Sequence, residues 1–168
     1  DGPPAPRSER PAAAFDMDRL KEKLQPNAPL CFQLVFGTEQ PDLTMNATVE
    51  ECHDETDAKG RRLVVMTKNY KHDGVDHYFA FVLRDGEVES VELMAAGEGP
   101  DGPEWKLVDR DTFWFKPIPG GKAELDADGD AVLSRKGVVN RERGSKSRHA
   151  ATLYLRTYHA EGAPDLDY

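Results

Sequence analysis

The stretch that decides the fold spans residues 61–94 and reads RRLVVMTKNYKHDGVDHYFAFVLRDGEVESVELM. Two Asp-Gly dipeptides, at 73–74 and 85–86, separate three segments rich in aliphatic and aromatic residues. An Asp-Gly pair between apolar runs predicts a two-residue hairpin, because both central residues of such a turn need positive φ. The stretch therefore predicts an antiparallel meander of three strands.

The first of these turns also predicts the register of its hairpin. Lys71 then opposes Asp76, which makes an ordinary cross-strand ion pair. Tyr70 opposes His77 and makes an ordinary aromatic pair. The segment 72–77 holds histidines and aspartates, which zinc and other transition metals use as ligands. Because the hairpin already pairs these side chains, we interpret the segment as an ordinary β-hairpin with polar and aromatic side chains. We assign neither a metal site nor a cofactor.

The third segment of the meander shows a break in its alternation. Val88 cannot share a face with Val91 and Leu93 unless one extra residue is inserted near Ser90. We expect a β-bulge at this position, and bulges bend strands in the way that a barrel requires.

Strand patterns continue on both sides of the meander, and a helical pattern precedes them. Met17, Leu20 and Leu24 share one helical face and predict a short amphipathic helix over 15–24. The further segments with alternating apolar residues are Leu30–Phe36, Leu43–His53, Glu104–Val108, Thr112–Lys116, Lys122–Leu125, Ala131–Ser134 and Ala150–Tyr158. Many short strands with connections of a few residues are typical of a barrel or a sandwich.

These patterns predict a mainly β fold. We expect an antiparallel up-and-down β-barrel with the short N-terminal amphipathic helix packed against it, and a two-sheet β-sandwich is the alternative. In outline such a barrel resembles the lipocalin-type group of small barrels. The chain lacks the Gly-x-Trp that this group carries near its first strand, and we assign it to no family.

Length and composition predict one folded domain with flanking segments. The chain has 168 residues, of which 38% are hydrophobic, so a single domain can bury a core. We divide it into a Pro/Ala-rich N-terminal tether (1–14), a β-barrel domain with its helix (15–160) and an acidic C-terminal tail (161–168). The formal net charge of −9 argues against general binding of nucleic acid or anionic membranes, and no apolar run is long enough to span a bilayer.

Cys31 and Cys52 are the only cysteines, and Asn46 begins an Asn-Ala-Thr acceptor triplet for N-glycosylation. Alternation in the segments 30–36 and 43–53 places both thiols on the polar faces of consecutive strands, where they can pair. We therefore predict a Cys31–Cys52 disulfide and a location outside the cytoplasm, in a secreted, periplasmic or lumenal protein. Two unrelated buried thiols in a cytosolic protein are the alternative.

The segment 135–148 is strongly basic in an otherwise acidic chain. We interpret it as a basic loop, flexible in its second half, for docking on an acidic protein partner, a phosphate-bearing ligand or an anionic surface, since clustered guanidinium groups recognise oxyanions well. A solvated loop without a partner is the alternative, and no aromatic residue lies within it to stack on single-stranded nucleic acid. Its basic residues are Arg135, Lys136, Arg141, Arg143, Lys146 and Arg148.

The sequence contains no nucleophile elbow, Walker loop or dinucleotide glycine fingerprint, and we name no catalytic residue. Our leading expectation is a non-enzymatic, extracytoplasmic β-barrel binding domain that holds a small apolar ligand in its interior. An accessory interaction subunit of a larger assembly, using the segment 135–148 and the terminal arms, is the alternative. A barrel isomerase or cyclase using His77 with Tyr70 or Tyr78 is less favoured. The residues expected to line the interior are Phe32, Leu34, His77, Phe79 and Phe81.

Overall fold

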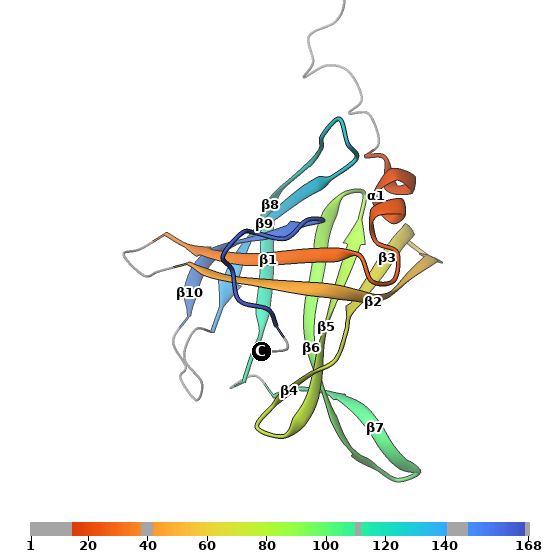
Figure 1. Cartoon of the computed structure of the whole chain (residues 1–168), viewed down its shortest axis with the longest axis vertical. Coiled ribbons are helices and arrows are strands. Elements are labelled where there is room, and N and C mark those ends of the chain that lie inside the picture. Colours follow the sequence, from red (N-terminus) through yellow and green to blue (C-terminus); the bar gives the residue numbers. More distant parts are fainter. Residues whose placement is uncertain (1–14, 38–41, 110–111, 141–147, 167–168) are drawn as a thin grey trace, which may run out of the picture.

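The computed structural model describes residues 15–37, 42–109, 112–140 and 148–166 (Figure 1). It has one short helix and ten strands, and neighbouring strands in the sheet are antiparallel, so the expected mainly β antiparallel fold is confirmed. In chain order the elements are α1 (Met17–Lys23), β1 (Pro29–Phe36), β2 (Leu43–Asp57), β3 (Gly60–Thr67), β4 (Tyr70–His72), β5 (Val75–Arg84), β6 (Glu87–Gly99), β7 (Gly102–Leu107), β8 (Phe115–Leu125), β9 (Ala131–Val139) and β10 (His149–Arg156).

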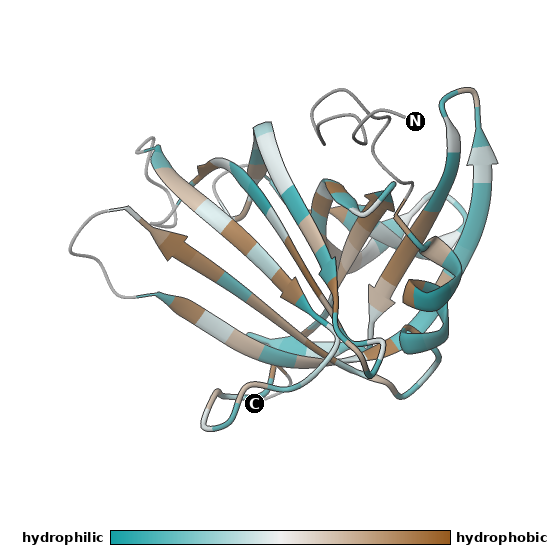
Figure 2. Ribbon diagram, turned by 90° about the horizontal axis from the view of Figure 1, so that it is seen from above, coloured by the Kyte–Doolittle hydropathy of each residue, from teal (hydrophilic) through white to brown (hydrophobic). Residues whose placement is uncertain are grey.

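The strands form one sheet in the order β7-β6-β5-β3-β2-β1-β10-β9-β8, and β4 pairs with β5 beside this path. The two ends of this order, β7 and β8, are not joined by a hydrogen-bonded ladder among the described residues. The sheet is curled (Figure 2), and β8 packs beside β6. The fold is therefore open and barrel-like, and we call the boundary between β6 and β8 the seam.

The core lies on the concave side of the sheet. Leu30, Phe32, Leu34 and Phe36 of β1 are all buried, as their alternation predicts. They belong to one continuous apolar cluster that also contains buried residues of the other long strands and of α1. Hydrophobic and hydrophilic positions alternate along several strands in Figure 2, as expected for a sheet with one dry and one wet face.

Both Asp-Gly hairpins of the meander are confirmed. Asp73 and Gly74 have φ angles of 52° and 79°, and Asp85 and Gly86 have φ angles of 51° and 78°. These positive values at both central positions are those of the type I′ turn, whose twist matches the right-handed twist of the flanking strands.

The predicted register and the predicted bulge are confirmed as well. Tyr70 of β4 pairs with His77 of β5. The ladder between β5 and β6 shifts beside Ser90, where Glu89 is the extra residue.

Some strand boundaries differ from the prediction. The segment 61–70 is divided at 68–69 into β3 and β4. The segments predicted at 112–116 and 122–125 belong largely to one strand, β8, whose ladder with β9 is irregular between Pro117 and Gly121. The prolines in this stretch are compatible with a strand because β8 is an end strand, where a missing N–H is tolerated.

The helix α1 forms where the apolar stripe predicts it. The Asp16 side chain caps its first turn by accepting a hydrogen bond from the Arg19 N–H at 3.1 Å. Met17, Leu20 and the C-cap residue Leu24 are buried in the core cluster. The expected packing of the helix against the sheet is therefore confirmed.

Ion pairs attach α1 to two hairpins of the sheet. Lys21 lies 3.1 Å from Asp54 of β2, and Lys23 lies 3.4 Å from Asp130 in the turn before β9. These are exposed pairs of modest individual value. They connect the helix to the β2–β3 hairpin and to the β8–β9 hairpin, whose ends lie near α1 in Figure 1.

The segment after β10 folds back over the outer face of β1 and β2. The Asn46 N–H donates to the Pro164 carbonyl at 2.8 Å, and its side-chain amide donates to Ala160 O and accepts from Ala160 N, both at 2.9 Å. Asn46 is 5% exposed, and its side chain is held by the C-terminal segment. The last described residues, predicted as an acidic tail, are part of the folded domain.

The predicted disulfide is not formed, and Cys31 and Cys52 are free thiols. Cys31 lies opposite Asn46, whereas Cys52 lies farther along β2, opposite Val65 of β3, roughly 20 Å away along the strand at about 3.3 Å per residue. A bulge at Glu50 shifts the alternation of β2, so Cys52 faces inward while Cys31 faces the C-terminal segment. The expected location outside the cytoplasm rested mainly on this disulfide.

Candidate functional site

The residues expected to line a ligand cavity do lie in the interior, but they fill it. The Phe32 ring lies 4.9 Å from the Phe79 ring and 5.9 Å from the Phe81 ring. Leu34 and His77 are buried beside them. None of the four surface hollows described for this fold is lined by any of these five side chains. They are packed with one another as core residues.

His77 is a buried histidine with a partner in its own strand. It is 8% exposed, and its Nδ1 lies 2.8 Å from the Val75 carbonyl. Its ring stacks on Tyr70 at 5.6 Å, and burial raises the pKa of Tyr70 to about 12. Tyr78 points to the opposite face of the sheet, where its ring lies 4.7 Å from Trp105. The structure therefore brings His77 together with Tyr70 and separates it from Tyr78.

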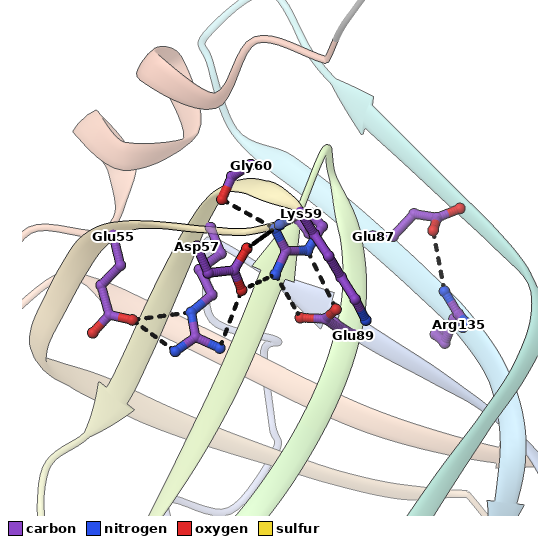
Figure 3. Close-up of polar contacts among 9 residues, drawn as sticks. Glu55, Asp57, Lys59, Gly60, Glu87, Glu89 and Arg135 are labelled. Carbon is purple, nitrogen blue, oxygen red and sulfur yellow. Dashed lines mark hydrogen bonds and ion pairs between the residues drawn. The ribbon is translucent and has the colours of Figure 1, made fainter.

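A network of charged side chains connects the β2–β3 hairpin to the β5–β6 hairpin (Figure 3). Arg84 donates to both carboxylate oxygens of Asp57, at 2.9 and 2.6 Å, and to Glu89 at 3.2 Å. These hydrogen bonds from Arg84 hold the pKa of Asp57 at about 2. Because its charges are engaged with one another, the network ties strands together and offers no open site for a substrate.

A second ion pair of Figure 3 closes one part of the seam. Arg135 of β9 lies 3.2 Å from Glu87 at the start of β6, and the Arg135 side chain is 17% exposed. The start of the expected basic loop is therefore strand, because β9 extends through Arg135 and the exposed Lys136. Docking through this segment stays a prediction. Three further residues of the expected basic loop lie outside the described residues: Arg141, Arg143 and Lys146.

Farther along the seam the two strands leave a hollow of about 350 Å³. Its walls are mostly apolar, and we call it the seam hollow. It is lined by Ser90, Val91, Glu92, Leu93, Leu107, Val108, Phe113, Trp114, Phe115, Lys116 and Pro117.

Local structure explains how these side chains meet. Val91 and Leu93 lie on β6, beyond the bulge that bends this strand, and both are nearly buried. Phe113 and Trp114 come from the segment before β8, and Phe115 is the first residue of β8. The Trp114 N–H donates to Asn140 Oδ1 at 2.7 Å. The Arg148 guanidinium lies 5.9 Å from the centre of the Trp114 ring and covers part of it.

A second hollow, of about 540 Å³, lies on the outer face of the sheet around Trp105. Tyr78 forms part of its wall, and burial, with the negative charges of Glu92 and Glu51, raises the pKa of this tyrosine. The lining mixes charged and apolar groups: Glu50, Glu51, Met66, Thr67, Lys68, Asn69, Tyr78 and Trp105. This surface is more polar than the seam hollow.

No protein-family model, curated protein or solved structure matches this chain. Its class therefore rests on geometry: it is a mainly β domain whose single antiparallel sheet curls into an open, barrel-like fold. In the described ranges, no helix is long and apolar enough to cross a bilayer. The same ranges contain no group of three or more His, Cys, Asp or Glu side chains placed to hold a metal ion.

The sequence analysis did not identify the seam hollow. The run Phe113-Trp114-Phe115 is visible in the sequence, but alternation assigned it to an ordinary strand. A clustering of three aromatic residues, with Trp114 out of phase with the inner face, is the signal that could have marked it. The run faces β6 because of the topology of the sheet, which the sequence pattern does not reveal.

Proposed function

We propose that the protein is a non-enzymatic binding domain that holds a small apolar ligand in the seam hollow. The observation that carries this proposal is the apolar hollow at the place where the sheet does not close. Among the described residues, Ser90, Glu92 and Lys116 are the ones that interrupt its apolar lining. Its volume of about 350 Å³ lies within the range of roughly 300–1,000 Å³ that is usual for small-molecule sites.

The lining favours a ligand with a flat apolar surface. Phe113 and Trp114 are partly exposed at the hollow, so a ligand can cover ring surface that water now contacts. Each square ångström of apolar surface removed from water contributes about 25 cal/mol, and stacked rings add to this. The filled interior and the paired charges of Figure 3 offer no comparable apolar surface.

The experiment is a titration of the protein with the neutral apolar probe 1-N-phenylnaphthylamine. We expect saturable binding, and we expect Trp114→Glu to weaken it at least about tenfold, because a carboxylate in the hollow must lose its water when the probe binds. Trp105→Glu is the matched control, since it makes the same change at the other tryptophan, on the outer face. Equal binding by the wild type and Trp114→Glu would refute the site.

Material from the natural source tests the function itself. Native mass spectrometry should show extra mass that is lost on denaturation and that corresponds to a small apolar molecule. A different protein in place of a small molecule would instead favour the interaction-subunit alternative and would count against this proposal.

A further inference from the structure

The end strand β7 has an exposed edge. It pairs with β6 on one side, and none of the described strands pairs with its other side. The β6–β7 hairpin projects away from the rest of the sheet (Figure 1). Trp105 and Leu107 on this strand are 41% and 61% exposed. An exposed edge offers backbone N–H and C=O groups with which another chain can pair.

The pairing with β6 shows which backbone groups of β7 face outward. The Val108 N–H donates to the Leu93 carbonyl at 3.0 Å, and the register continues without a shift through β7. Because bonded and non-bonded residues alternate in an antiparallel ladder, the N–H and C=O groups of Leu107 and Trp105 point away from β6. The next outward position is Pro103, whose missing N–H costs nothing at a free edge.

The sequence of β7 is complementary to itself when two copies run antiparallel with Trp105 at the centre. Each Trp105 then exchanges both backbone hydrogen bonds with its counterpart, and each Leu107 N–H donates to the Pro103 carbonyl of the other copy. Glu104 of each copy lies opposite Lys106 of the other. Directly opposed unlike charges stabilise a strand pair, and like charges destabilise it.

We propose that a second copy of this chain pairs with β7 about a two-fold axis at Trp105, so that the two sheets join into one. This interface is isologous, since the same strand is used by both copies. Within one copy Glu104 and Lys106 lie 3.7 Å apart. Both charges therefore lie at the edge of the sheet, where Lys106 and Glu104 of the second copy lie opposite them. The inference concerns a partner that the proposed ligand site does not involve, and the two surfaces share only Leu107 among the residues named here.

The test is sedimentation velocity over a concentration series at physiological salt. We expect a concentration-dependent dimer whose Kd rises about tenfold or more in Lys106→Glu, because each opposed pair then becomes Glu–Glu. Glu104→Lys should weaken it similarly by creating Lys–Lys pairs. The double variant Glu104→Lys/Lys106→Glu restores opposite charges in both pairs and should return the Kd to the wild-type value. Glu98→Lys is the matched control, an exposed change of the same charge on β6.

Three outcomes would overturn the proposal. A wild-type protein that stays monomeric throughout the series has no such interface. A double variant as weak as the single variants shows that these charges do not oppose one another. A Glu98→Lys effect equal to that of Glu104→Lys assigns the change to net charge. Circular dichroism of each variant confirms that these exposed substitutions leave the fold intact.

Discussion

Replacing Leu20 by alanine should lower the free energy of unfolding by about 3 kcal/mol. Leu20 is fully buried, and its side chain lies in the core cluster with Met17 and Leu24. Leucine-to-alanine changes in packed cores cost roughly 2.7–5 kcal/mol, the lost transfer energy plus the cavity that remains. The helix has only seven residues and lies at the margin of the core, so it can settle partly into the cavity. We therefore expect a value near the lower limit.

The assay is equilibrium unfolding in urea, followed by tryptophan fluorescence. The midpoint should fall while the slope of the transition stays constant, since the surface exposed on unfolding is nearly unchanged. In a thermal scan the same loss corresponds to roughly 6–12 °C in Tm, at about 2–4 °C per kcal/mol for a chain of this size. Glu22→Ala is the control, because Glu22 is exposed on the same helix, and its effect should stay within about 0.5 kcal/mol.

A loss of less than about 1 kcal/mol in Leu20→Ala would refute the reasoning, because a leucine buried in a packed core cannot be truncated at so small a cost. An equal loss in Glu22→Ala would also refute it. That result would assign the effect to helix formation and not to the packing of α1 on the sheet.

Further predictions concern the thiols, one glycine and one carboxylate. Cys31 and Cys52 should react with Ellman's reagent only after unfolding, because burial raises the pKa of both thiols, that of Cys52 to about 11; the unreduced mass of a paired protein, two hydrogens lower, would contradict this. Gly137→Ala should cost about 1–3 kcal/mol in urea unfolding, since its Cβ would lie 2.5 Å from a ring atom of β8 and 2.6 Å from a backbone oxygen of that strand; unchanged stability would show that the strands separate freely. Hydrogen bonds from Arg84 hold the pKa of Asp57 at about 2 in the folded protein, below the unfolded value of about 3.9. This carboxylate therefore contributes stability above about pH 4 and loses it as the pH falls toward 2. The Tm difference between the wild type and Asp57→Asn should be constant from neutral pH to about pH 4 and then shrink, and a difference that grows on acidification would contradict the assignment.

The parts of the fold that depend on neighbouring residues could be predicted from the sequence. The turn at 73–74, the opposition of Tyr70 and His77 and the bulge beside Ser90 all follow from dipeptides and alternation within a few residues. The helix α1 follows from three apolar residues on one face. In each case the physical cause is local, so the sequence alone carries the information.

The remaining features depend on contacts between distant parts of the chain. The bulge at Glu50 leaves no mark in the alternation of β2, and it alone reverses the face of Cys52. The burial of Asn46 depends on a segment more than a hundred residues away. The seam hollow depends on which strands end the sheet, and this order is set by the pairing of β1 with β10.

The position of β1 between β2 and β10 has a consequence for how the chain folds during synthesis. Gln33 of β1 bonds Arg156 of β10 across 123 positions, which a ribosome covers in roughly 6–25 s at about 5–20 residues per second. Throughout this interval the edge of β1 that later pairs with β10 has no partner. The other edge of β1 can already pair with β2. Slow closure is expected of such non-local pairing, and an open apolar edge is where mispairing between nascent chains begins. A strand that is paired on both edges in the finished sheet therefore has one open edge while the chain is being made.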